Sequence, residues 1–122
     1  MKHAKPTLVI GANTDPSRYA YKAIKRLRAS GHPVIAFGPR PGHIDDVEIE
    51  NSWNPDWEVD TVTLYINPTR QPEYVQKIVD LKPRRVIFNP GTENSAFMRE
   101  LRQNGIESEM ACTLVMLATD QY

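Results

Sequence analysis

Short apolar runs alternate with amphipathic stretches along almost the whole chain, which leaves few folds open to it. Buried parallel strands appear as continuous apolar runs, whereas surface helices show a single apolar stripe. The pattern predicts strands at residues 8–10, 33–37, 61–66, 85–88 and 106–109, with helices between them. Strands that alternate with helices form parallel sheets covered on both faces. We therefore predict an α/β fold, a doubly wound and mostly parallel five-stranded sheet flanked by helices.

Turn-forming and helix-breaking residues set the expected ends of these elements. We expect the first helix to open near Asp15 and Pro16 and a second to follow Thr69 and run through about residue 81. Periodicity is weak over residues 43–60, so we expect irregular structure there, with a short strand around residues 48–50.

Length and charge restrict the class of protein. A chain of 122 residues is close to the commonest size of one domain, so we expect a single domain over residues 1–122. Fifteen basic and fifteen acidic residues cancel, which gives no sign of binding to nucleic acid or an anionic membrane. No apolar run approaches the roughly 18 residues of a membrane span. A single cysteine rules out an internal disulfide or cysteine-cluster zinc site and is consistent with the expected cytoplasmic location.

The first strand-to-helix turn carries features of an anion site. A tight turn at Gly11 leads into a helix whose first backbone N–H groups lack partners within the helix. Arg18 and Lys22 are four residues apart and can project from one side of that helix. A phosphate-bearing ligand and an ordinary strand–helix unit with a solvated basic face both remain open on these residues alone.

The other strand ends carry similar sequences. Segments 38–42, 65–69 and 89–94 are rich in Gly, Pro, Asn or Thr, and ligands of open α/β sheets bind at the carboxyl ends of strands. A nicotinamide dinucleotide is disfavoured, because the first turn has one glycine and the second strand ends in Pro39 and Arg40 instead of an acid. The chain also has no phosphate-binding P-loop motif. We expect Arg18, Lys22 and Arg40 to converge on a ligand with several phosphates, unless they are ordinary surface charges.

These motifs resemble those of the small stand-alone CoA-binding proteins, whose fold is similar to the N-terminal domain of the succinyl-CoA synthetase alpha subunit. The resemblance covers nearly the whole chain and is carried by residues 11–13, 16–22, 31–32, 60–65, 89–94 and 111–115. It implies a Rossmann-like domain that binds coenzyme A (CoA) or an acyl-CoA at the strand ends.

The resemblance also implies positions for the parts of the ligand. Gly11, Ala12, Asn13, Ser17 and Arg18 would meet the phosphates, with Lys22 adding its charge. The adenosine and its phosphates would lie beside Pro39 and Arg40. The pantetheine arm would lie along two loops, with Glu93 near its far end; these loops comprise Tyr65, Ile66, Asn67, Pro68, Asn89, Pro90 and Gly91.

The sequence contains no recognisable catalytic constellation. We expect a non-catalytic carrier, sensor or partner module and no metal ligands, with His3, His32 and His43 as surface histidines. Two alternatives remain: a CoA-dependent enzyme or enzyme subunit that uses Glu93 or Cys112, and an NADP-type binder. The sequence leaves open the acyl group and the pathway, as well as whether the chain forms a homo-oligomer or binds a protein partner.

Overall fold

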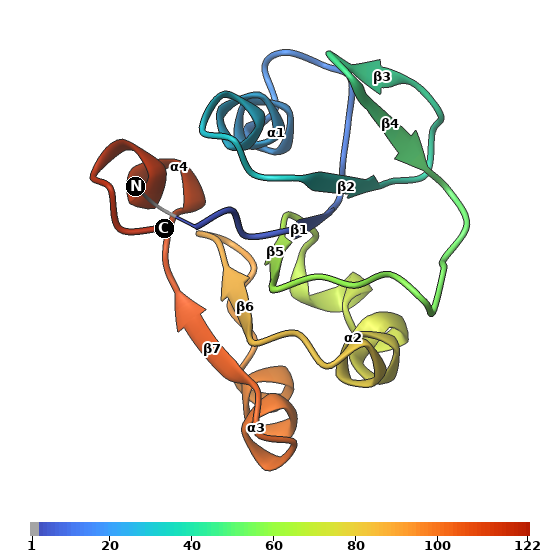
Figure 1. The fold of residues 1–122 in the computed structure, drawn as a ribbon. Helices are drawn as coiled ribbons and strands as arrows, with labels where there is room; N and C mark the ends of the chain where they lie inside the picture. Colours follow the sequence, from blue (N-terminus) through green and yellow to red (C-terminus); the bar gives the residue numbers. More distant parts are fainter. Residues whose placement is uncertain (1–2) are drawn as a thin grey trace.

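A seven-stranded sheet forms the centre of the computed structural model, which describes residues 3–122 (Figure 1). The strand order is β3-β4-β2-β1-β5-β6-β7, and all neighbouring pairs are parallel except β3 and β4. The strands are β1 (Thr7–Ile10), β2 (Val34–Phe37), β3 (His43–Ile44), β4 (Val47–Glu50), β5 (Thr61–Leu64), β6 (Arg85–Phe88) and β7 (Glu107–Met110). The prediction of a doubly wound, mostly parallel α/β sheet is confirmed.

The predicted count of five strands is too low, because a small hairpin extends one edge of the sheet. β3 and β4 pair antiparallel around a turn in which Asp45 has a φ of 53°. In β4 only Val47 and Ile49 are buried, while Glu48 and Glu50 face solvent. β4 lies next to the edge strand β3 and has one solvent-facing side, so its residues alternate between apolar and polar and lack the continuous apolar run that marks the central strands.

Within residues 3–122, four helices cover the sheet: α1 (Tyr19–Ala29), α2 (Val75–Leu81), α3 (Ser95–Gln103) and α4 (Thr113–Ala118). Two departures from the predicted bounds have local causes. α1 begins only at Tyr19, because Asp15 accepts a hydrogen bond from the Ser17 backbone and holds a turn before the helix. The helix expected from Thr69 is replaced at first by two 3₁₀ turns, η1 (Pro68–Arg70) and η2 (Pro72–Tyr74), since Pro72 has no N–H to continue a helix.

The two faces of the sheet carry separate cores. On one face, Val9 and Ala36 of the sheet belong to a cluster with Ala20, Ile24 and Leu27 of α1. On the other face, side chains of β1, β5 and β6 pack with α2 and α3; this cluster includes Leu8, Ile10, Val62, Leu64, Phe88, Ile78, Phe97 and Leu101. Figure 1 shows α1 and α4 on one side of the sheet and α2 and α3 on the other. Helices that follow β1 and β5 therefore run to opposite faces.

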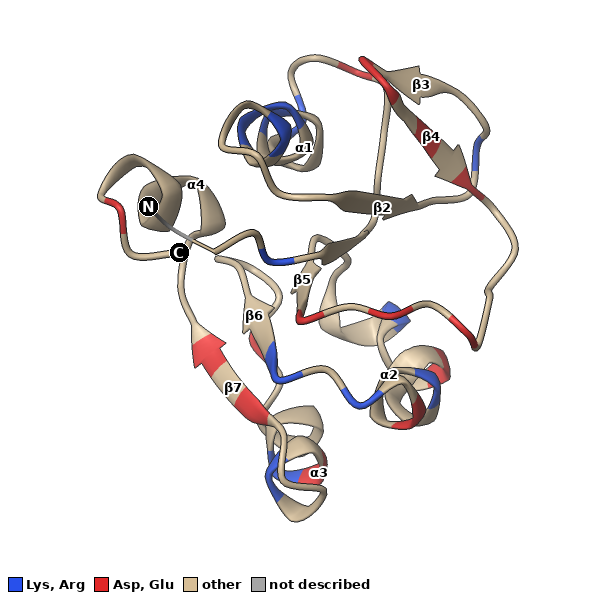
Figure 2. Ribbon diagram, in the orientation of Figure 1, with Lys and Arg blue, Asp and Glu red and all other residues tan. Residues whose placement is uncertain are grey.

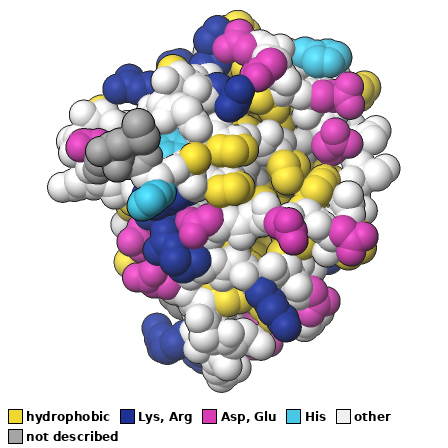
Figure 3. All heavy atoms as spheres, in the orientation of Figure 1, with side chains coloured by type: hydrophobic (Ala, Val, Ile, Leu, Met, Phe, Trp, Pro, Cys, Tyr) yellow, Lys and Arg dark blue, Asp and Glu magenta, His cyan; other side chains and the backbone are white. Residues whose placement is uncertain are grey.

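No helix lies between β4 and β5; two tryptophans of the irregular connection pack there instead. Trp53 and Trp57 pack against the core on the α2 face, with ring centroids 5.4 Å and 6.1 Å from that of Phe37. Tyr74 completes this aromatic cluster at 5.7 Å from Phe37. Hydrophobic side chains gather near the centre of the face seen in Figure 3, with acidic side chains beside them. The aromatic rings thus take the place of a helix over β2.

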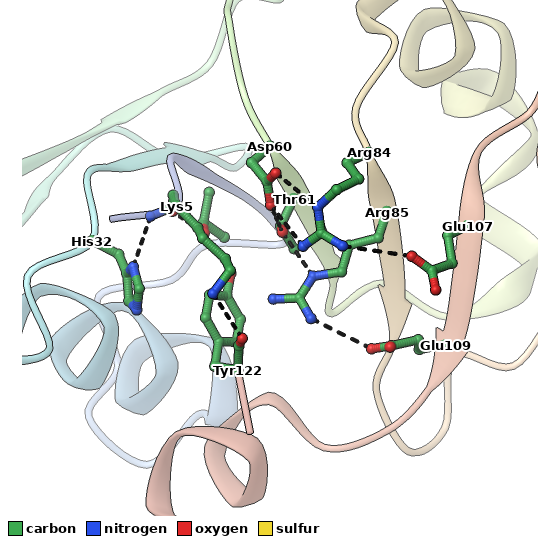
Figure 4. Close-up of polar contacts among 10 residues, drawn as sticks. Lys5, His32, Asp60, Thr61, Arg84, Arg85, Glu107, Glu109 and Tyr122 are labelled. Carbon is green, nitrogen blue, oxygen red and sulfur yellow. Dashed lines mark hydrogen bonds and ion pairs between the residues drawn. The ribbon is translucent and has the colours of Figure 1, made fainter. Parts of the chain in front are cut away.

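Charged residues are unevenly distributed over the elements. Figure 2 shows basic residues along α1 and acidic residues on β4 and β7. At the amino ends of β5 and β6, Arg84 pairs with Asp60 at 2.9 Å, and the buried Arg85 donates to Thr61 at 2.9 Å and lies 3.6 Å from Glu109 (Figure 4). The cations at this edge therefore already have protein partners. Within residues 3–122, no helix has the length and apolar character needed to span a bilayer.

His32 is buried, which corrects the expectation that it is a surface histidine. Its side chain is 6% exposed, and its Nδ1 accepts a hydrogen bond from the Lys5 backbone N–H at 2.9 Å (Figure 4). Burial lowers the pKa of His32, and the charges of Lys5 and Arg85 act in the same direction. The folded protein therefore holds this imidazole neutral, with the proton on Nε2.

We expect this histidine to make stability pH-dependent. The unfolded chain takes up a proton at His32 near its ordinary pKa of 6.5, whereas the folded protein resists protonation until lower pH. The contribution of His32 to stability is therefore complete above pH 6.5 and is lost as the pH falls. Urea unfolding between pH 5.5 and 8 should show this loss in the wild type and in His43→Gln, but a smaller one in His32→Asn. Identical pH profiles for all three proteins would contradict the assignment.

Candidate functional site

A cleft of about 840 Å³ opens at the carboxyl ends of β1, β2, β5 and β6. β1 lies between β2 and β5, and the helices that follow β1 and β5 pack on opposite faces of the sheet. This is the topological switch point, where the loops of an open α/β sheet diverge and ligands bind. The volume lies in the range of small-molecule sites, about 300–1,000 Å³.

Two glycines bring the loops of the cleft floor together. The backbone N–H groups of Gly11 and Ala12 both donate to the Phe37 carbonyl, at 2.9 Å and 3.0 Å. A Cβ at Gly38 would lie 2.3 Å from the Ala12 carbonyl oxygen, and one at Gly11 would lie 2.9 Å from that of Tyr65. Gly11 also has a φ of +100°, which side chains disfavour. Larger residues at either position would push the strand ends apart.

The first wall of the cleft is the loop from β1 into α1. Asp15 accepts hydrogen bonds from the Ser17 backbone N–H at 2.9 Å and from the Ser17 hydroxyl at 2.8 Å. These bonds lower the pKa of Asp15, with a smaller contribution from Arg18, whose Nε is 3.9 Å away. The loop is therefore ordered by its own side chains before the helix starts.

The N-terminus of α1 lies at this wall with its backbone donors uncapped. Arg18 is the N-cap residue and makes no side-chain cap, and the first turn carries no acidic residue. Tyr19 and Ala20 line the cleft, and N–H groups at these positions have no partner within the helix. Together with the helix dipole, they form a site that favours an anion.

The second wall is formed by the loop after β5 together with the loop after β6. Gln71 is fully buried, and its Nε2 donates to the carbonyls of Ile66 at 3.0 Å and Thr92 at 2.8 Å. Asn94 in turn donates to Gln71 Oε1 at 3.0 Å. Arg70 and Tyr74 belong to this fixed loop, and both line the cleft. Gln71 thus ties the two loops into one wall.

Asn89 supports the cleft from below. Its Nδ2 donates to Thr63 Oγ1 at 2.6 Å and to the Leu64 carbonyl at 2.9 Å, and its Oδ1 accepts from the Thr113 N–H at 2.9 Å. Asn89 therefore holds β5, β6 and the start of α4 in register. Burial raises the pKa of Tyr65 beside this network to about 12, so its phenol stays protonated at neutral pH.

Most of the residues expected to bind a ligand lie together in the cleft. Those on its lining are Gly11, Ala12, Asn13, Ser17, Arg18, Pro39, Tyr65, Ile66, Asn67, Pro90 and Gly91. Five others are not part of the lining: Lys22, Arg40, Pro68, Asn89 and Glu93.

The structure shows the neighbours of three of those five residues. The Lys22 Nζ lies 5.3 Å from the ring centroid of Tyr19, which lines the cleft, although Lys22 itself does not. Asn89 is buried in the network beneath the floor. The Glu93 carboxylate accepts a hydrogen bond from the Gly91 N–H at 2.9 Å, and so closes the turn after β6.

The cleft also contains residues that sequence reasoning missed, chiefly Tyr19, Asn51, Arg70 and Tyr74. Arg70 follows the expected 65–69 loop by one residue, so a longer window at that strand end would have included it. Asn51 follows a strand that the sequence only weakly indicated.

The charged residues of the lining are Arg18 and Arg70, and none of the lining residues is acidic. This edge of the sheet differs from the amino edge, where the arginines are paired with carboxylates.

Cys112 is the N-cap residue of α4, is partly buried and is not among the lining residues. Within residues 3–122, no group of three or more His, Cys, Asp or Glu side chains is arranged to hold a metal ion.

The fold and the position of the cleft are those of Rossmann-like α/β domains, in which ligands bind at the carboxyl ends of parallel strands. A family model described as a CoA binding domain matches residues 5–118. The chain therefore belongs to this CoA-binding domain family, and the resemblance seen in the sequence is confirmed.

Solved structures agree with this assignment at the level of the fold. A crystal structure of an uncharacterized protein is 45% identical, with a TM-score of 0.95, over 99% of this chain and 100% of that one. The protein cell-free ID.343 from Thermus thermophilus is 23% identical, with a TM-score of 0.84, over 98% and 91% of the two chains.

More distant structures include an NADPH-dependent glyoxylate/hydroxypyruvate reductase from Sinorhizobium meliloti. It is 16% identical, with a TM-score of 0.63, over 88% of this chain and 47% of that chain. At this identity the likeness concerns the fold alone. A search of curated proteins gives no match.

Proposed function

We propose that this protein binds coenzyme A or an acyl-CoA in the cleft and acts as a non-catalytic carrier, sensor or partner module. The observation that carries the proposal is the uncapped N-terminus of α1, with Arg18 beside it, at the wall of a cleft whose lining has no acidic residue. Membership of the CoA-binding domain family supports CoA binding in general.

The geometry of the cleft suits the separate parts of such a ligand. The diphosphate would lie against the N–H groups at the start of α1, and the adenosine beside Pro39 and Asn51. The pantetheine arm would run along Tyr65 to Asn67 and across Pro90 and Gly91. A hydrogen bond to a charged group contributes about 1.5–3 kcal/mol. A few such bonds, less the cost of ordering the ligand, correspond to roughly micromolar affinity, about −8 kcal/mol.

Calorimetry with CoA and dephospho-CoA tests the proposal. We expect measurable CoA binding that Arg18→Ala weakens at least several-fold, because the variant removes a charged contact to a phosphate. Arg99→Ala is the matched control, since Arg99 is an exposed arginine of α3 away from the cleft lining. Absence of binding up to millimolar CoA would refute the function. Native mass spectrometry of protein purified without added ligand gives an independent check, because retained CoA would appear as a defined mass increase.

The alternative, an enzyme that uses Glu93 or Cys112, has weaker geometric support. The Glu93 carboxylate is engaged by the Gly91 N–H, and Cys112 is not among the residues that line the cleft. Turnover of an acyl-CoA that disappears in Glu93→Ala or Cys112→Ser would favour this alternative over the non-catalytic module.

A further inference from the structure

We propose that Arg70 is a second phosphate-binding residue of the cleft and makes the site selective for ligands that carry more than one phosphate group. This inference rests on the proposed function and names a residue that determines its specificity. Arg70 would act together with Arg18, and the ligand would be held from both walls of the cleft.

The topology places the two arginines on different walls. Arg18 ends the loop after β1 and precedes α1, whereas Arg70 lies in the loop after β5 and precedes α2. β1 and β5 are neighbours in the sheet, but α1 and α2 pack on opposite faces. The two loops therefore diverge from a common floor, and both arginines line the space between them.

The backbone of Arg70 is held firmly while its side chain is exposed. Its N–H donates to the Asn67 carbonyl at 3.0 Å, and the next residue is the buried Gln71, which is bonded to the carbonyls of Ile66 and Thr92. Prolines at positions 68 and 72 restrict the loop on either side. A charge carried on a rigid backbone loses less entropy when a ligand binds.

The charge of Arg70 has no carboxylate partner among the ion pairs of residues 3–122. Arg18 has only the exposed Asp15, at 3.9 Å. Arg84 and Arg85 at the opposite edge of the sheet, by contrast, are paired with acidic residues.

This arrangement distinguishes ligands by their number of phosphates. A single phosphate at the start of α1 can be satisfied by the helix N–H groups and Arg18. A diphosphate carries further oxygens away from the helix, and the planar guanidinium of Arg70 can bind two of them at once. Arg70 should therefore contribute to binding of CoA and dephospho-CoA, less to binding of 4′-phosphopantetheine, and not at all to binding of pantetheine.

The test is calorimetry of these four ligands with the wild type, Arg70→Gln, Arg70→Lys and the control Arg99→Gln. We expect Arg70→Gln to weaken CoA binding about tenfold and to reduce the preference for CoA over 4′-phosphopantetheine by a similar factor. Arg70→Lys should recover part of the affinity through its charge, and Arg99→Gln should behave as the wild type. Thermal unfolding of each variant checks that the loop remains folded.

Three results would overturn the inference. CoA binding by Arg70→Gln equal to that of the wild type would exclude the contact while leaving the proposed function intact. An equal loss for CoA and 4′-phosphopantetheine in Arg70→Gln would show that Arg70 only maintains the wall. A wild-type protein that binds none of the ligands would overturn the proposed function and the role of Arg70 together.

Discussion

Gly38→Ala should destabilise the protein by about 3 kcal/mol and abolish ligand binding in the cleft, at the upper end of the range for overpacked sites. The added Cβ would lie 2.3 Å from the Ala12 carbonyl oxygen and 3.4 Å from the Ala12 nitrogen. Both atoms belong to the backbone, so no rotamer change can relieve the clash. The loop after β1 must move away from β2, and that loop forms the first wall. Urea unfolding and calorimetry with CoA measure the two effects.

Gly105→Ala provides the control for this substitution. A Cβ at Gly105 would have no atom within 4 Å, and the position lies at the end of α3, outside the cleft lining. Its φ of +73° still costs an alanine about 1 kcal/mol. We therefore expect a modest loss of stability and unchanged ligand binding. If Gly38→Ala lowered the free energy of unfolding no more than Gly105→Ala does, the close approach of the two loops would not be the constraint that the structure indicates.

Asn89→Ala should lower the free energy of unfolding by roughly 3 kcal/mol, because it leaves buried polar groups without partners. The Thr113 N–H and the Leu64 carbonyl both lose a hydrogen bond that Asn89 now supplies. Each orphaned group costs about 1–3 kcal/mol in a site that water cannot reach. Chemical denaturation of the purified variant measures the change.

Asn104→Ala is the matched control for Asn89, since it removes an asparagine that is exposed at the end of α3 and donates to the Glu100 carbonyl. Solvent can replace that bond, so the expected loss is below about 1 kcal/mol. A comparable loss at both positions would mean that the network under the cleft floor is less important than its geometry implies.

The sheet could be predicted because its central strands are buried on both faces. β1, β5 and β6 are buried along their whole length, so apolar or β-branched residues dominate them and the runs stand out. The β3–β4 hairpin is an edge and alternates in polarity, which hides it in a stretch of weak periodicity. The helix that contains α2 was predicted to begin too early, directly after Thr69. Apolar spacing alone does not show where Pro72 interrupts the helical hydrogen bonds.

The position of the cleft could be predicted from the parallel sheet. Which cations line the cleft could not, because that depends on side-chain directions that sequence spacing does not give. Arg18, Lys22 and Arg40 were expected to converge. In the structure Arg18 lines the cleft, while Lys22 lies against the Tyr19 ring and Arg40 follows the lining residue Pro39. Arg70 lines the cleft because the turns η1 and η2 fold the chain back toward β2, where Tyr74 contacts Phe37. A local sequence window does not show this change in chain direction, because it depends on tertiary packing.

The aromatic cluster that replaces a helix between β4 and β5 has a practical consequence. The two indole rings of the chain, Trp53 and Trp57, both pack against Phe37, and Trp53 also lies 6.0 Å from Tyr74. Phe37 and Tyr74 are themselves part of the cleft lining. All tryptophan emission of the protein therefore originates one ring away from the ligand space. We therefore expect ligand binding in the cleft to change the intrinsic tryptophan fluorescence, so that binding could be followed without an added label.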